Sequence, residues 1–315
     1  SFPTRRSSDL VVFAIAANAD WAGLISVLIE GAVPDRWGFG MNEQHFGLMC
    51  ILALLTVGIF FKEWVGKGSN IWRLSRVVLL AALVVIFLAA LLITKARTVW
   101  IAFFILLVLA AMLGVAFWLK RSQKNEKSGI ILLAAVAFIA VFVYAQRDAI
   151  EQRLLPELRV VAEYLGTGGA VSYESSMSIR FHLWDIAKEG IFARPFFGWG
   201  PAGEKRLISE AETKPAAIRE FGHVHNSFLG LAVRGGVVGV VIFSAVILLI
   251  GRSVVSARRR GCLDDRLALY LIIVFGVFMF VNLTESYLDR QIGWIVAAFF
   301  GGASYSFSLH RPEEG

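Results

Sequence analysis

Two histidines separated by one residue, and followed by an asparagine, stand directly before a long apolar run in FGHVHNSFLGLAVRGGVVG, residues 221–239. An imidazole has the unperturbed side-chain pKa closest to neutrality, so His225 has the chemistry to accept a proton from a hydroxyl nucleophile. The structural alternative is that His225 merely precedes a helix that Asn226 or Ser227 caps. His223 and His225 would supply half of a metal site, but no cluster completes the ligand set at a recognisable spacing, so we expect no metal.

Three charged side chains elsewhere have the chemistry to bind an anion or to support a base. Arg97, in ITKARTVWIAFF, is either an interfacial arginine that snorkels beside Trp100 or a bidentate ligand of phosphate. Arg180, in SSMSIRFHLW, lies one helical turn before Trp184, so it either stacks on the indole or binds phosphate. Glu285, in VNLTESYLD, has a carboxylate that can pair with an arginine, bind an acceptor sugar or remain solvated.

The composition shows that these residues belong to a membrane protein. Of the 315 residues, 57% are hydrophobic and 17% are charged, whereas an ordinary soluble domain has about 45–50% and about 25%. A helical crossing needs about 20 apolar residues, and such runs recur along the chain. We therefore predict an all-α, polytopic transmembrane helical bundle with about eight crossings, near residues 11–29, 46–61, 77–93, 99–118, 130–145, 228–250, 267–284 and 291–309.

The formal net charge of +7 comes from basic loops near residues 62–76, 120–127 and 252–266, which alternate with loops that hold few lysines and arginines. The positive-inside rule places these basic loops in the cytoplasm. The charge is therefore a signal of topology, and we expect no nucleic-acid partner.

One long segment, residues 146–227, lies between the fifth and sixth crossings, and the alternation of basic loops places it in the periplasm. It contains two helical patterns separated by GTGG, and the cluster RPFFGWGPAG ends the second. We expect a small helical domain over the outer membrane face. Arg234 interrupts the apolar stretch that follows, but it lies only about 12 Å along a helix from Asn226 and can snorkel.

The first ten residues, SFPTRRSSDL, resemble the translation of one frame of a sequencing-adapter oligonucleotide, although Arg5 and Arg6 also fit the start of a signal peptide. We expect residues 1–10 to be non-native and native helices before them to be missing. The remaining organisation is then five crossings, a large periplasmic loop, three crossings and a cytoplasmic tail, in residues 11–145, 146–227, 228–309 and 310–315.

Several short motifs, taken in order, resemble the O-antigen ligase and polymerase family. That pattern combines an Arg-x-x-x-Trp helix, a Pro-x-x-Gly-x-Gly turn and a His-Asn-x-x-Leu motif before a glycine-rich crossing. These read here as RFHLW (180–184), PFFGWG (195–200), HNSFL (225–229) and GGVVG (235–239). LLITKART and RWGFGMNEQHFG resemble two earlier segments of the family, with Ala96 where serine is common and QH where a Pro-Asn-like pair is more usual.

The resemblance implies a GT-C-like, inverting, metal-independent and cofactor-free glycosyltransferase, embedded in membrane lipid, with its site on the periplasmic face of the bacterial inner membrane. Such enzymes transfer a glycan from undecaprenyl diphosphate to lipid A–core or to another glycan chain, so ligase and polymerase both stay open. By position in the motifs, His225 would be the base on the acceptor hydroxyl, and Arg97 and Arg180 would hold the donor diphosphate. Three further residues are candidates for support: Asn226, His223 and Glu285.

A secondary transporter is the alternative from another class. It would explain the crossings, but transporters more often show internal repeats and broken helices that meet at mid-membrane. Here the polar residues are predicted to gather at one interface. A non-catalytic membrane scaffold is the third alternative, and it does not explain why His225 and the arginines are predicted to lie on one face of the membrane.

Overall fold

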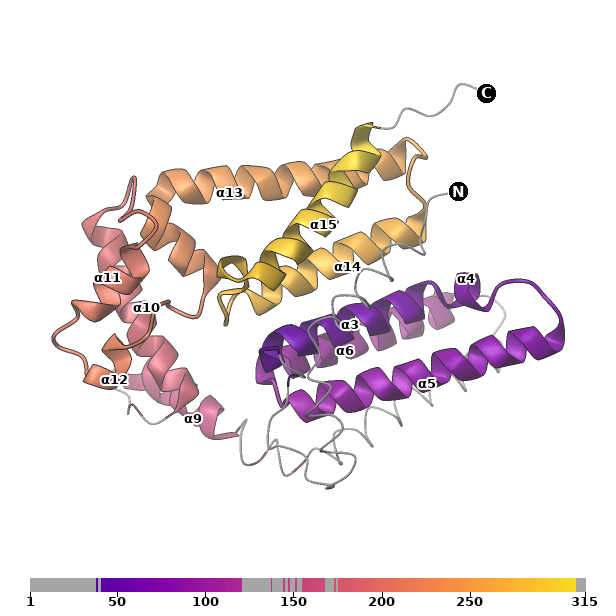
Figure 1. Cartoon of the computed structure of the whole chain (residues 1–315), viewed down its shortest axis with the longest axis horizontal. Helices are drawn as coiled ribbons and strands as arrows, with labels where there is room; N and C mark the ends of the chain where they lie inside the picture. Colours follow the sequence, from indigo (N-terminus) through magenta and orange to yellow (C-terminus); the bar gives the residue numbers. More distant parts are fainter. Residues whose placement is uncertain are drawn as a thin grey trace. The chain divides into compact units, whose positions relative to one another are not determined.

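A computed structural model of the chain describes residues 41–120, 155–167 and 175–309, together with a few single positions outside these ranges. All regular elements of this part of the chain are helices, which confirms the all-α prediction for it (Figure 1). In chain order the elements are α3 Glu43–Ile59, α4 Phe61–Val65, α5 Asn70–Thr94, α6 Arg97–Lys120, α9 Leu155–Thr167, α10 Ser176–Ala193, α11 Gly203–Ser209, α12 Ala216–Arg219, α13 Ser227–Arg259, α14 Asp265–Val281, the 3-10 helix η2 Tyr287–Asp289 and α15 Gln291–Leu309.

Six of the eight predicted crossings coincide with described helices, namely α3, α5, α6, α13, α14 and α15. By length and composition, α5 and α13 are suited to cross a membrane. Helix α3 and the part Arg97–Leu113 of α6 are shorter apolar stretches. The number of crossings and the periplasmic location of the large loop therefore stay predictions. Four predicted segments fall wholly or mostly outside the described residues: 1–10, 11–29, 130–145 and 310–315.

The chain divides into two compact units. Unit 1 comprises Ser1–Trp100, Val246–Val281 and Tyr287–Gly315, and unit 2 comprises Ile101–Ala245 and Asn282–Ser286. In unit 1, α3 packs along α5, and α4 contacts both helices. Their shared apolar core contains Val57, Val65 and Leu80, and the indole N–H of Trp100 donates to the carbonyl of Leu91 at 2.9 Å. That hydrogen bond joins the start of α6 to the end of α5.

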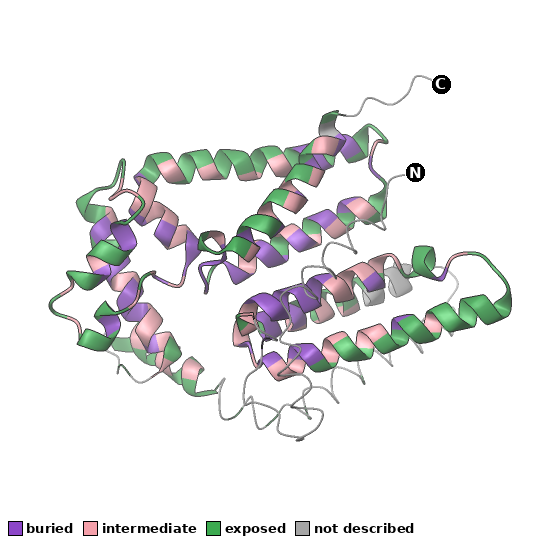
Figure 2. Cartoon of the chain, viewed as in Figure 1, coloured by how far each residue is buried: buried purple, intermediate pink, exposed green. Residues whose placement is uncertain are grey.

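The segment predicted as a loop domain is helical and has its own apolar core in unit 2. Helix α10 is central, because it contacts α9, α11 and α12. Figure 2 shows buried positions on these helices and on the chain that enters α13. A fully buried aliphatic side chain contributes about 1.5–3 kcal/mol, so this segment is a folded domain and not a linker. The buried core residues are Leu183, Ile186, Ala187, Ile208, Ile218, Val224 and Val233.

Local sequence signals fix both ends of α10. Ser175 and Ser178 form a reciprocal capping box, with both hydrogen bonds at 3.0 Å. Glu157 on α9 accepts a hydrogen bond from the backbone N–H of Met177 at 2.9 Å, and a carboxylate is favourable at the positive end of a helix. The helix ends where the predicted proline and glycine cluster begins, because the residue before a proline disfavours helical backbone.

Helix α13 is interrupted at Gly236, where φ is 58° and ψ is −157°. This break divides the helix into a first segment, residues 227–235, and a second segment, residues 237–259, and it falls within the predicted crossing 228–250. An interruption leaves backbone groups without helical partners. The turn at residues 195–200 satisfies them on both sides.

Four hydrogen bonds join this turn to the break. The N–H groups of residues 199 and 200 donate to the carbonyls of residues 233 and 234, at 2.8 and 3.0 Å. The N–H groups of residues 237 and 238 donate to the carbonyls of residues 195 and 196, at 2.7 and 3.1 Å. A Cβ on Gly198 or Gly236 would lie 2.4 Å from a backbone oxygen of the opposite segment, so the two glycine-rich motifs permit the close approach.

Candidate active site

His225 and Glu285 form the centre of the candidate site, within unit 2. Nδ1 of His225 lies 3.1 Å from Oε1 of Glu285, and both side chains are largely shielded from solvent. A histidine whose one nitrogen is bonded to a carboxylate has a fixed ring orientation and tautomer. Its other nitrogen is then the proton acceptor. The pair thus has the geometry of an oriented general base.

Arg180 is a second neighbour of Glu285 and carries a positive charge. Its Nη2 lies 3.9 Å from Oε2 of Glu285, and the backbone N–H of Ser286 donates to Oε1 at 3.3 Å. Burial would raise the pKa of Glu285, but the hydrogen bond to His225 and the electrostatic interactions with His225 and Arg180 outweigh it and lower this pKa from 4.5 to about 2. Glu285 is therefore ionised at neutral pH.

The Arg-x-x-x-Trp motif of α10 holds both segments that carry the pair. The indole N–H of Trp184 donates to the carbonyl of Val224, immediately before the histidine, at 3.0 Å. Nε of Arg180 donates to the carbonyl of Thr284, immediately before the glutamate, at 3.1 Å. Residues four apart share one face of a helix. One face of α10 therefore positions the residue before each member of the pair.

The backbone around the histidine is also constrained. The Asn226 side chain accepts hydrogen bonds from the N–H groups of residues 228 and 229, at 3.0 and 3.1 Å, which confirms it as the cap of α13. The N–H of Ser227 donates to the carbonyl of Asn282 at 3.0 Å. His225 has a φ of 52°, a left-handed conformation that is uncommon outside glycine. These features fix the direction in which the imidazole leaves the chain.

His223 stands beside His225, with 4.2 Å between the ring centroids. His223, His225 and Glu285 each offer one ligand atom, and these atoms lie within 4.8 Å of one another. A His-His-carboxylate set is one that zinc uses. Two contacts weigh against a divalent cation: Nδ1 of His223 accepts the backbone N–H of His225 at 3.3 Å, and Arg180 places positive charge beside the carboxylate. The absence of a metal stays a prediction.

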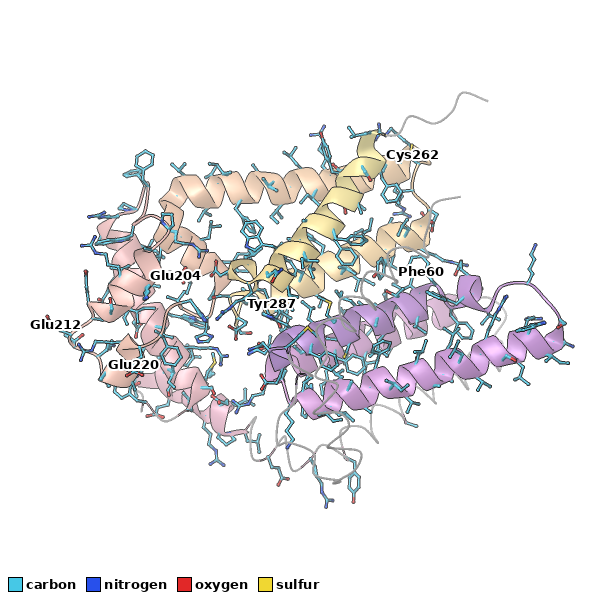
Figure 3. All side chains as sticks on the ribbon, in the orientation of Figure 1. Phe60, Glu204, Glu212, Glu220, Cys262 and Tyr287 are labelled. Carbon is cyan, nitrogen blue, oxygen red and sulfur yellow. The ribbon has the colours of Figure 1, made fainter. Side chains whose placement is uncertain are left out.

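An ion pair between a buried glutamate and a half-buried arginine lies beside the site, and the sequence does not predict it. Nη1 of Arg234 lies 3.0 Å from Oε1 of Glu204. Glu204 is on α11 (Figure 3), and 4% of its surface is exposed. Oε2 of Glu204 accepts the N–H of Val224 at 3.1 Å. A Cβ on Gly230 would lie 2.6 Å from the same carboxylate. Arg234 therefore has a structural partner, where the sequence suggested only that it snorkels.

Arg97 is the first residue of α6, is partly buried, and belongs to unit 1. Lys95, just before it, adopts a left-handed backbone conformation with φ 47° that forms the turn between α5 and α6. Its predicted contact with a diphosphate stays a prediction. The predicted site residues that the structure brings together in unit 2 are Arg180, His225 and Glu285, with His223 and Asn226 beside them.

Comparisons with known proteins agree with the motifs. Residues 82–244, slightly more than half of the chain, match the O-antigen ligase family. A Haemophilus influenzae protein described as uncharacterized is 24% identical over 260 residues, which cover 79% of this chain and 60% of that relative. The chain thus spans less than two thirds of the length of that relative.

Proposed function

Because the chain belongs to the O-antigen ligase family, we propose that it is a membrane glycosyltransferase that moves a glycan from undecaprenyl diphosphate to an acceptor hydroxyl. The acceptor is a sugar of lipid A–core or of a growing polysaccharide, and the reaction takes place at the periplasmic face of the inner membrane without metal or cofactor. The observation that supports this most is the hydrogen bond between His225 and Glu285, with Arg180 beside it.

His225 acts as the general base in this proposal. Its Nδ1–H donates to Glu285, so that Nε2 accepts the proton of the acceptor hydroxyl. The acceptor oxygen forms a bond to the anomeric carbon while the bond from that carbon to the diphosphate breaks. Undecaprenyl diphosphate leaves with the electron pair, and attack opposite to it inverts the anomeric configuration. The ionised Glu285 stabilises the imidazolium that results.

Arginines stabilise the charge that develops on the departing diphosphate. Arg180 lies at ion-pair distance from Glu285, which puts a guanidinium next to the base, and guanidinium is the group that binds phosphate bidentately. Arg97 is the second such residue by its position in the motif. Removal of one preorganised donor of this kind typically reduces a rate by about 10²–10³.

The break in α13 is an observation that favours a transporter, since broken helices are common at transport sites. In transporters the freed backbone groups contact the substrate or the coupling ion. Here the turn at residues 195–200 takes up the N–H and carbonyl groups on both sides of Gly236. The break is therefore better explained as a docking point for the loop domain than as an ion site.

The decisive experiment replaces His225 in a strain that carries no other copy of the gene. We expect His225→Ala and His225→Asn to insert in the membrane at normal abundance and to transfer no glycan. Asparagine tolerates the left-handed backbone better than most residues, so it controls for a purely conformational effect. Normal surface polysaccharide in the strain with His225→Ala would refute the assignment of His225 as the general base.

Two further measurements complete the assignment of the reaction. In the deletion strain, unligated lipid-linked polymer indicates a ligase, whereas capping with a single repeat indicates a polymerase. Transport of a glycan or ion without any new glycosidic bond would favour the transporter. In proteoliposomes, transfer should persist in a chelator, and a loss that Zn²⁺ restores would show that the cluster of His223, His225 and Glu285 holds a metal.

A further inference from the structure

Three phenylalanine side chains at the end of α10 and in the following turn are highly exposed. Phe192, Phe196 and Phe197 have 74%, 68% and 78% of their surfaces accessible, and Figure 2 shows the turn after α10 as an exposed region. An aromatic side chain of this size normally buries about 150–250 Å². A cluster of such exposed rings marks a surface that contacts a membrane or a partner.

The turn that carries two of these rings is fixed against α13. The carbonyls of Pro195 and Phe196 accept the N–H groups of Val237 and Val238, at 2.7 and 3.1 Å. Gly236 leaves no side chain between the two backbones, because a Cβ there would lie 2.4 Å from the carbonyl oxygen of Phe196. The rings are therefore held beside the start of the second segment of α13.

That second segment has the properties of the membrane-spanning part of α13. Helix α13 is long and apolar enough to cross a bilayer, and Val237, Val238 and Val241 are exposed next to the turn. A crossing of about 20 residues that starts at residue 237 ends near the basic residues 258–260, as expected for a cytoplasmic end. The turn that carries Phe196 and Phe197 thus lies next to exposed apolar positions at the start of this segment.

The residues that flank the phenylalanines are of types found at the level of the lipid headgroups, just outside the hydrocarbon core of the bilayer. The guanidinium of Arg194 lies 4.0 Å from the ring centroid of Trp199, and arginine and tryptophan are suited to the level of the lipid headgroups. On the other side of the break, Arg234 is paired with Glu204. The change from polar to apolar therefore falls between residues 234 and 237.

We propose that Phe192, Phe196 and Phe197 form an aromatic anchor that inserts into the outer leaflet of the membrane at the point where α13 enters it. The occupant of this surface is bilayer lipid, because the anchor continues the surface of a helix suited to cross the bilayer. The anchor fixes the height of the loop domain above the hydrocarbon. This inference does not depend on the chemistry proposed for His225.

Site-directed spin labelling of the full chain tests the anchor. Cys50 and Cys262, the two cysteines of the chain, are replaced by alanine, and single cysteines are introduced by Phe192→Cys or Phe197→Cys. The matched control is Glu212→Cys, on an exposed side chain between α11 and α12 that points outward (Figure 3). Each labelled protein is reconstituted in phosphatidylcholine and phosphatidylglycerol vesicles, and collisions with O₂ and with a water-soluble nickel chelate are compared by EPR.

We expect labels at 192 and 197 to collide severalfold more with O₂ than with the nickel chelate, and the label at 212 to show the reverse. Phe196→Ser combined with Phe197→Ser should move the label at 192 toward water. Nickel access at 197 equal to that at 212 would overturn the anchor. Exclusion of both reagents at 192 and 197 would show a protein contact instead, which also overturns it. Circular dichroism of each variant checks that the helices are retained.

Discussion

The Nδ1 atom of His225 lies 3.1 Å from a carboxylate oxygen of Glu285, although the two residues are 60 positions apart in the sequence. This contact gives the two imidazole nitrogens different roles. One nitrogen faces an ionised acid, and the other is left to exchange a proton with a substrate. Glu285 is therefore a positioning residue for the base in the proposed reaction.

Glu285→Gln should slow glycan transfer by about 10²–10⁴, the range of a general-base contribution. The amide can donate to Nδ1 of His225, which would put the ring proton on the nitrogen that must accept one from the acceptor. The measurement is the initial rate with a saturating lipid-linked donor, together with the amount of folded protein. Full activity of the glutamine variant would show that the carboxylate charge has no part in orienting the base.

Arg180→Lys and Trp184→Phe separate charge from positioning on one face of α10. Lysine keeps the charge but loses the bidentate geometry and the Nε contact with the carbonyl of Thr284, so we expect transfer to fall by about 10²–10³. Phenylalanine loses the hydrogen bond to the carbonyl of Val224 and part of the ring that packs on the core, but changes no charge, and should lower the free energy of unfolding by about 1–3 kcal/mol. Equal losses of activity in the two variants would argue that Arg180 acts only by positioning.

The partly buried ion pair between Glu204 and Arg234 should matter for stability more than an exposed pair. Glu204→Gln leaves the half-buried Arg234 without its countercharge, which should cost about 1–3 kcal/mol. The control is Glu210→Gln, which breaks the exposed pair of Arg206 and Glu210 and should cost at most about 0.5 kcal/mol. Thermal unfolding in detergent measures both losses, and similar midpoints would show that the pair of Glu204 and Arg234 contributes no more than the exposed pair.

Gly236 and Gly235 make a matched pair of tests for the break in α13. Gly236→Ala places a Cβ 2.4 Å from the carbonyl oxygen of Phe196 at a φ of 58°, so it should destabilise the protein by about 1–3 kcal/mol or more. Gly235→Ala meets no atom within 4 Å, and should leave stability unchanged or raise it by up to about 1 kcal/mol. Equal unfolding midpoints for the two variants would show that the backbones do not meet as described.

Features encoded within a few residues could be predicted from the sequence. The spacing of Arg180 and Trp184 indicates one helix face, Asn226 is a candidate cap by its residue type, and the glycine and proline cluster marks the end of α10. Each depends on local backbone preference or on helical periodicity. The apolar runs likewise predicted the helices, although Gly235 and Gly236 gave no unambiguous signal of a break.

Contacts between distant segments could not be predicted in the same way. Nothing local links Glu285 to His225. The sequence leaves several roles open for Glu285, because an exposed acid and a buried one have the same sequence signature. Glu204 and Arg234 belong to different helices and carry no shared periodicity. Such pairs depend on how α10 and α11 pack against the entry of α13, which one sequence does not specify.

The pKa of Glu285 predicts a dependence of stability on pH. Burial acts to raise this pKa, but His225 and Arg180 lower it from 4.5 to about 2. A depressed folded-state pKa stabilises the protein above the unfolded-state value, by about 3 kcal/mol for a shift of this size, and the effect is lost as the pH falls from 4.5 to about 2. The difference in stability between the wild type and Glu285→Gln should therefore be largest above pH 4.5 and should shrink toward pH 2.

Unfolding midpoints at several pH values between 7 and 3 measure this difference, with the exposed Glu212→Gln as the control that should show little change. A difference that stays constant or grows as the pH falls would mean that the carboxylate is not held in its ionised form by these two neighbours.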